Sequence, residues 1–157
     1  ANISNIGLYY AQPLTEKNVK VKLSDVSVKD WKTVGMPAEA ANAIDGDPQT
    51  VWTAKALTPL VVDMGKASEV IGFSYAPAQK EDLTGTIYKY NFYVSIDGKN
   101  WTKCDAGGEF SNIMHNPVPY FVRFGKKYPA RYFKLEPVAE INNKPATTVG
   151  EVGILLK

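Results

Sequence analysis

Residues 85–101 read GTIYKYNFYVSIDGKNW and predict a β-hairpin. Apolar and polar residues alternate along the centre of this stretch, and alternate side chains of a strand point to opposite faces of a sheet. Four residues therefore share one predicted core-facing side: Tyr90, Phe92, Val94 and Ile96. Asp97-Gly98 follows directly and favours a tight turn, and Trp101 opens the return strand.

The same pattern recurs on both sides of this hairpin. Further strands are predicted over residues 19–23, 60–64, 70–75, 120–124, 132–135 and 152–156. Gly, Pro, Asn and Asp separate them, and prolines in the second half argue against long helices. Only Pro37–Ala43 favours a short helix or turn. About eight short strands of this kind predict an all-β antiparallel sandwich.

Composition excludes several classes of function. Positive and negative charges nearly balance, with a net charge of +2. Only two of the 18 basic residues are arginines, Arg123 and Arg131, so we expect no nucleic-acid partner. No apolar run approaches the length of a membrane span, so no membrane insertion is expected. Cys104 is the only cysteine and His115 the only histidine, which leaves no disulfide and no recognised Cys–His catalytic spacing.

The loop Asn42–Trp52 reads NAIDGDPQTVW and carries the most specific chemistry. Asp45 and Asp47 flank Gly46, which permits a tight left-handed bend, and Thr50 follows three residues after Asp47. Such a bend turns carbonyl, carboxylate and hydroxyl oxygens toward one point, as Ca²⁺ requires. A plain Asx turn explains the same residues, so both interpretations stay open at this stage.

Several segments, in order, resemble the discoidin or F5/8 type C family. The loop Asn42–Trp52 is similar to the family's AxDGxxxTxW loop, and residues 85–101 to its G-x-I-x-x-Y…V-S-x-D-G-x-x-W stretch. Residues 60–65 (LVVDMG), 70–77 (VIGFSYAP) and 130–135 (ARYFKL) are similar to other family strands. The resemblance covers residues 19–157, and residues 1–18 are expected to be a linker or an extra N-terminal strand.

This resemblance implies an eight-stranded antiparallel jelly-roll β-sandwich of the galactose-binding-domain-like kind. It also implies a structural calcium ion that ties the early loop to the last strand. Carried over onto this sequence, the metal-binding residues are Asn42, Asp45, Asp47, Thr50, Gly150 and Glu151. Because protein oxygens fill such a coordination sphere, the expected role of the cation is structural.

Many members of the family are carbohydrate-binding modules of bacterial glycoside hydrolases, such as fucosidases and hexosaminidases. The implied function is binding of the terminal sugars of glycans through loops at one end of the sandwich. Candidate ligand-binding residues, chosen as polar or aromatic loop positions, are Lys55, Tyr75, Gln79, Asn112, His115 and Asn142. Three common sugar contacts are missing, because Ala78 replaces an arginine, residues 146–149 hold no aromatic, and residues 53–55, just after Trp52, hold no histidine.

The alternative is a structural or protein-docking domain of a larger glycosidase. We expect no catalytic residue in this domain, since the spacing of Asp105, Glu109 and Glu140 supports no carboxylate pair for hydrolysis. Coagulation-type relatives that bind membranes are expected to carry a disulfide that closes the domain, and a chain with one cysteine cannot form it. The expected partners are a glycan and the catalytic domain of a parent protein, with the module a monomer. The expected location is extracellular, periplasmic or on a bacterial cell surface.

Overall fold

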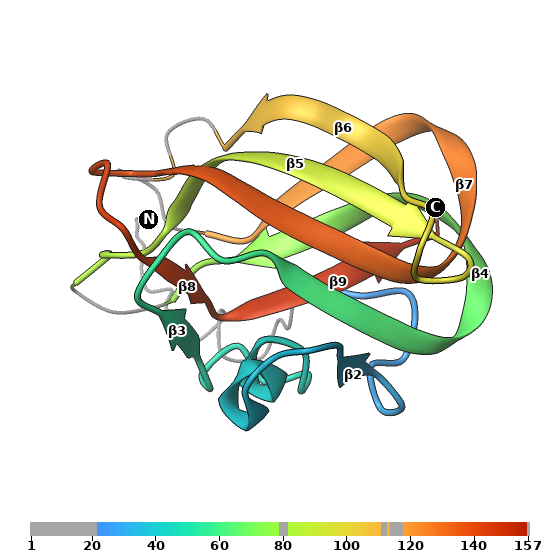
Figure 1. Cartoon of the computed structure of the whole chain (residues 1–157), viewed down its shortest axis with the longest axis horizontal. Coiled ribbons are helices and arrows are strands. Elements are labelled where there is room, and N and C mark those ends of the chain that lie inside the picture. The colour runs from blue at the N-terminus through green and yellow to red at the C-terminus, as the bar shows by residue number, and fades with distance from the viewer. Residues whose placement is uncertain (1–21, 79–81, 111–112, 114–117, 157) are drawn as a thin grey trace, which may run out of the picture.

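The computed structural model describes residues 22–78, 82–110, 113 and 118–156, and these form an antiparallel β-sandwich (Figure 1). The all-β prediction is confirmed. The proposed linker or extra strand at residues 1–18 lies outside the described residues. The elements are β2 (Lys32–Thr33), a 3₁₀-helix η1 (Ala38–Ala43), β3 (Trp52–Ala54), β4 (Leu60–Ala76), β5 (Ile87–Ser95), β6 (Thr102–Glu109), β7 (Tyr120–Glu140), β8 (Thr147–Val149) and β9 (Glu151–Leu155).

Two long strands, β4 and β7, hold the sandwich together. The main sheet has the order β2-β4-β7-β5-β6, and β9 pairs with the second half of β4. The β4–β7 register shifts between Asp63 and Ser68 and again between Val70 and Gly72. Such irregularities bend a strand, and Figure 1 shows both strands curving around the same end of the molecule.

These bends explain a difference from the predicted strands. Residues 60–64 and 70–75 were expected as two strands but are one, and the same holds for 120–124 and 132–135. Pro129 and Pro137 lie inside β7, although proline removes a donor from the ladder. Each lies beside a register shift, at Asp63/Ser68 for Pro129 and at Lys89/Tyr90 for Pro137, where the regular bonding pattern is already interrupted.

Aromatic rings fill the core. Phe73 of β4 stacks on Phe92 of β5 with ring centroids 4.2 Å apart, and Tyr75 stacks on Phe110 at 4.9 Å. Pairs of this kind add to the stabilisation that burial of their surface provides. The alternation of β5 is confirmed for Tyr90, Phe92 and Val94. It is wrong for Ile96, which is 51% exposed because β5 ends one residue earlier.

The short pair β3–β8 gathers several connections at one end of the sandwich. Trp52, Thr53 and Ala54 lie opposite Val149, Thr148 and Thr147. A parallel bridge also joins Thr86 to Thr148. The connection after β3, the residues before β5 and the connection from β7 to β8 therefore approach one another, at the left of Figure 1. We call this region the loop end, formed by residues 55–58, 82–86 and 138–147.

Candidate functional site

The loop that follows η1 folds as tight Asx turns. Gly46 has φ +83°, so the predicted left-handed bend is confirmed. The backbone N–H of Asp47 donates to Asp45 Oδ1 at 2.9 Å, and the N–H of Gln49 donates to Asp47 Oδ1 at 2.9 Å. These bonds place both carboxylates on the same tight loop.

The hydroxyl of Thr50 sits among three acceptor oxygens. It lies 2.8 Å from the Asp47 carbonyl oxygen and 3.4 Å from that of Asn42. It also contacts Asp45 Oδ2. A hydroxyl has one hydrogen to donate, so it cannot satisfy all three acceptors with hydrogen bonds. A cation would explain this crowding of oxygens better than hydrogen bonds alone.

Glu151, at the start of β9, completes this cluster from the far end of the chain. Its side chain is 2% exposed, and Oε2 accepts the Gly46 N–H at 2.8 Å. Oε1 is buried with no hydrogen-bond partner among the described residues. Burial is the main reason why the pKa of the Glu151 carboxyl is raised to about 8; the Gly46 N–H lowers this pKa, and the charges of Asp45 and Asp47 raise it. An oxygen in this state is one that a bound cation would satisfy.

The residues present therefore fit a hard cation with oxygen ligands. The structure brings five predicted residues together, namely Asn42, Asp45, Asp47, Thr50 and Glu151. Gly150 is buried beside them, and its N–H donates to the Ala76 carbonyl at 2.8 Å. In the described part of the chain, no three His, Cys, Asp or Glu side chains alone form a metal site. Backbone and hydroxyl oxygens are thus essential to any cation here.

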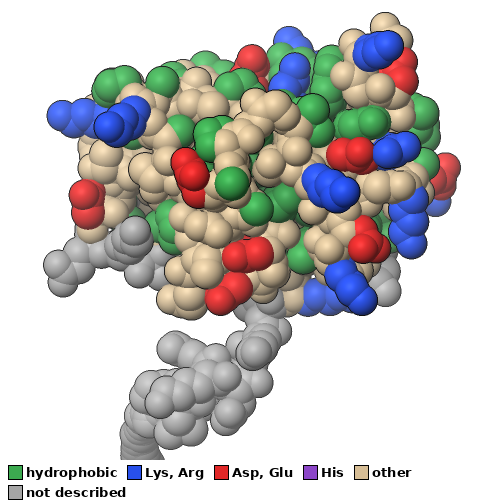
Figure 2. All heavy atoms as spheres, turned by 60° about the horizontal axis from the view of Figure 1, so that its bottom comes forward, with side chains coloured by type: hydrophobic (Ala, Val, Ile, Leu, Met, Phe, Trp, Pro, Cys, Tyr) green, Lys and Arg blue, Asp and Glu red, His purple; other side chains and the backbone are tan. Residues whose placement is uncertain are grey.

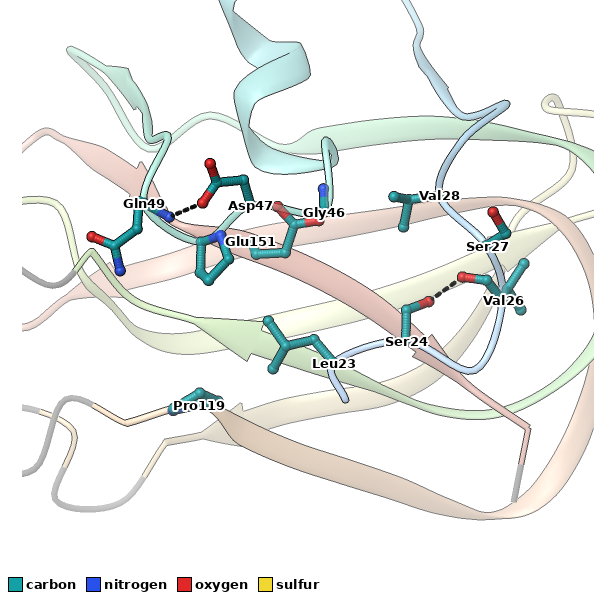
Figure 3. Close-up of a pocket in the computed structure, with 11 residues that line it drawn as sticks. Leu23, Ser24, Val26, Ser27, Val28, Gly46, Asp47, Gln49, Pro119 and Glu151 are labelled. Carbon is teal, nitrogen blue, oxygen red and sulfur yellow. Dashed lines mark hydrogen bonds between the residues drawn. The ribbon is translucent and has the colours of Figure 1, made fainter. Parts of the chain in front are cut away.

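A pocket of about 860 Å³ adjoins this cluster (Figure 3). Figure 3 shows Gly46 and Glu151 close together on one wall, with Leu23, Ser24 and Val26 across from them. Its remaining lining includes Pro48 and Pro119, so much of its surface is apolar.

The predicted ligand-binding residues fall into three groups. Lys55 and Asn142 are exposed at the loop end. Tyr75 is fully buried, which corrects its assignment to a ligand-facing surface: it shares the core-facing side of β4 with Phe73. The remaining three, Gln79, Asn112 and His115, lie outside the described residues.

The loop end holds a second pocket, of about 420 Å³, that the sequence interpretation did not identify. Leu57 and Val138 give it an apolar wall and are 40% and 47% exposed. Asn143, Lys144 and Pro145 line it from the connection after β7. The signal in the sequence was an apolar residue shortly after Trp52, together with the turn residues 142–145.

Other charged groups have structural roles. Arg131 binds Asp63 through two hydrogen bonds of 2.9 and 3.1 Å, as expected for a structural ion pair, and this bond lowers the pKa of the Asp63 carboxyl. Asp105 accepts a hydrogen bond from the Tyr90 hydroxyl, and Glu109 accepts one from the Tyr88 hydroxyl.

Figure 2 shows both signs of charge spread over the face that it presents. None of the described helices is long and apolar enough to cross a membrane.

Comparison with known proteins agrees with this geometry. The F5/8 type C domain family matches residues 22–152. A galactose oxidase of Gibberella zeae is 29% identical in an alignment of 143 positions that covers 83% of this chain and 20% of that protein. The chain thus spans about a fifth of this curated relative.

Solved structures show the same fold. A family 32 carbohydrate-binding module from Clostridium perfringens, in complex with GalNAc-β-1,3-galactose, is 22% identical with a TM-score of 0.70, over 83% of this chain and 98% of that one. A Bacteroides ovatus structure described as an α-L-fucosidase is 35% identical with a TM-score of 0.65, over 94% of this chain and 22% of that one.

Proposed function

Since this chain belongs to the F5/8 type C domain family, we propose that it is a non-catalytic carbohydrate-binding module that binds terminal sugars of glycans at its loop end. The observation that carries this proposal is the pocket of about 420 Å³ at that end. Leu57 and Val138 offer an apolar surface for the C–H face of a sugar ring. Asn143 and Lys144 offer an amide and an ammonium group for its hydroxyls.

The proposed ligand is galactose or N-acetylgalactosamine at the end of a glycan. Support comes from the Clostridium perfringens module, which is described in complex with GalNAc-β-1,3-galactose. Binding would be weak for a single sugar, because the described lining of the pocket contains no aromatic ring on which the sugar could stack.

We also propose a structural calcium ion held by Asn42, Asp45, Asp47, Thr50, Gly150 and Glu151. The unpartnered Oε1 of Glu151 and the crowded oxygens around Thr50 support this assignment. The ion would supply positive charge to a buried carboxylate and join the loop after η1 to β9. That role concerns stability and takes no part in ligand chemistry.

The parent protein is proposed to be a secreted bacterial glycoside hydrolase. The α-L-fucosidase of Bacteroides ovatus supports this, because its similarity extends over 94% of this chain. An extracellular, periplasmic or cell-surface location follows from that context. The galactose oxidase relative has a different catalytic chemistry, so the F5/8 type C domain by itself does not specify the parent enzyme.

Calorimetric titration with galactose and N-acetylgalactosamine tests the proposal. We expect saturable millimolar binding, and a loss of about tenfold in Lys144→Ala, the value of one charge-assisted hydrogen bond. Lys99→Ala is the matched control, because Lys99 is an exposed lysine in the turn between β5 and β6. Absence of binding to these and to a glycan panel would contradict sugar recognition.

That negative result would favour the second candidate, a structural or protein-docking domain of a larger glycosidase. One observation supports this candidate: Ala78 and residues 147–149 are buried and present no side chain to the pocket. Co-purification with the catalytic domain of the parent protein would test it. A docking domain should form a stable complex there, and a sugar-binding module on a linker should not.

A further inference from the structure

Glu140, the last residue of β7, carries a buried carboxylate that the proposed function does not use. Its side chain is 2% exposed, yet it lines the pocket at the loop end. Burial of a carboxylate is unfavourable unless hydrogen bonds replace its hydration. The contacts of its two oxygens therefore indicate what this residue does.

Both oxygens accept backbone N–H groups from the loop end. Oε1 accepts the N–H of Asn142 at 2.6 Å and that of Lys144 at 2.9 Å. Asn143, between them, has φ +60°, a left-handed conformation that turns neighbouring N–H groups toward the same side. Such a concave set of N–H groups binds anions, and here the anion is the Glu140 carboxylate.

Oε2 reaches a different segment of the chain. It accepts the N–H of Gly85 at 2.8 Å, across 55 residues of sequence. Gly85 has φ +93°, and a Cβ there would lie 2.1 Å from Thr148 Oγ1, so only glycine fits. The N–H of Thr148 in turn donates to the Gly85 carbonyl at 2.7 Å. One side chain thus joins residues 82–86 to residues 141–145.

We propose that Glu140 is a positioning residue that fixes the geometry of the loop end and so sets the shape of its sugar pocket. It acts through the backbone of residues 142–144, which presents Asn143 and Lys144 to the pocket. The effect on affinity rests on the proposed function. The ordering of the two loops does not, and it is measured separately.

Glu140→Gln tests this, because the amide keeps one acceptor oxygen and places an NH₂ group against a backbone N–H. We expect amide hydrogen exchange at Gly85, Asn142 and Lys144 to accelerate by about tenfold or more, with core amides of β5 and β7 unchanged. Glu136→Gln is the matched control. It lies four residues earlier on β7, and the hydrogen bonds that its carboxylate accepts among the described residues come from the side chains of Asn91 and Tyr93. We expect no change at the three amides in that variant.

Sugar titration supplies the second measurement. We expect galactose affinity to fall by about tenfold in Glu140→Gln and to be unchanged in Glu136→Gln. Unchanged exchange at the three amides, or faster exchange with wild-type affinity, would overturn the proposal. If the wild-type protein binds no sugar, the proposed function has failed, and the exchange rates alone decide whether Glu140 orders both loops.

Asn143→Val keeps the test valid if Glu140→Gln does not fold. Asn143 is exposed, and a β-branched residue strongly disfavours its left-handed backbone. This variant leaves the carboxylate intact but disrupts the backbone conformation that directs the Asn142 and Lys144 N–H groups toward it. Exchange should then rise at Asn142 and Lys144 and stay unchanged at Gly85; the exchange rates decide this test, since Asn143 is itself a proposed sugar contact. Wild-type exchange at Asn142 and Lys144 would contradict the proposal.

Discussion

The substitution Tyr75→Phe distinguishes a core residue from a ligand contact. The Tyr75 hydroxyl donates to the Thr148 carbonyl at 2.8 Å and accepts the Ile87 N–H at 3.1 Å, with none of the side chain exposed. Phenylalanine fills the same volume but leaves both backbone groups without this partner. A ligand contact would lose affinity on this substitution, whereas a core residue would lose stability.

The magnitude follows from these two hydrogen bonds. A buried group left without its partner costs about 1–3 kcal/mol, and the Thr148 carbonyl retains a second lone pair, so we expect a total near 2–3 kcal/mol. For a chain of 157 residues, each kcal/mol lowers the melting temperature by about 2–4 °C. The expected decrease is therefore about 5–10 °C.

Guanidinium unfolding, followed by the fluorescence of the buried Trp31 and Trp52, measures this loss. The denaturant slope should not change, since the surface exposed on unfolding is the same. Tyr88→Phe is the control, because its hydroxyl bonds to Glu109 on the surface, and it should cost less than about 0.5 kcal/mol. A loss below 0.5 kcal/mol in Tyr75→Phe, together with reduced sugar affinity, would refute the assignment of Tyr75 to the core.

Three further predictions concern charge and burial. Saturating calcium should raise the melting temperature by about 5–10 °C, as expected at a hundredfold excess over its dissociation constant, and Glu151→Gln should abolish most of that increase in a thermal scan. Burial raises the pKa of the Cys104 thiol to about 12, so its labelling by Ellman's reagent at pH 8 should run below about 1% of the rate of a free thiol, and unfolding in guanidinium should restore that rate. Arg131 holds the pKa of Asp63 below 3.8, so this ion pair stabilises the fold above about pH 4 and loses its effect as pH falls further. The free energies of unfolding of wild type and Asp63→Asn, taken from melting curves, should differ by about 1 kcal/mol or less at pH 7, because the pair is partly exposed. The two values should converge at pH 2.

The fold could be predicted because its signals are local. Alternation in residues 90–94 and the Asp97-Gly98 turn depend only on neighbouring residues. The continuity of β4 could not be predicted in this way, because Gly65 with φ +87° is equally compatible with the end of a strand and with a bulge inside one. The burial of Tyr75 was accessible from the sequence, since it lies two residues after Phe73 on the same face.

The two candidate sites also differ in how much of them the sequence predicts. The bend at Gly46 follows from the sequence Asp-Gly-Asp, but its contact with Glu151 spans 105 residues and came only from the family resemblance. The network at Glu140 depends on the left-handed Asn143 and on the approach of Gly85. Neither the spacing nor the composition of the chain specifies those backbone angles, so from the sequence Glu140 is considered only as a catalytic carboxylate, which its spacing does not support, and nothing there indicates its role in ordering the loop end.

The central claim is that the loop end binds sugar, and a two-dimensional ¹H–¹⁵N NMR titration with galactose tests it most directly. Binding at the proposed pocket predicts concentration-dependent shifts of the backbone amides of Leu57, Val138 and residues 142–144. Amides of the turn at residues 97–100 should not move, because that turn joins β5 to β6 outside the loop end. Shifts confined to that turn, or no shifts at saturating sugar, would contradict the account.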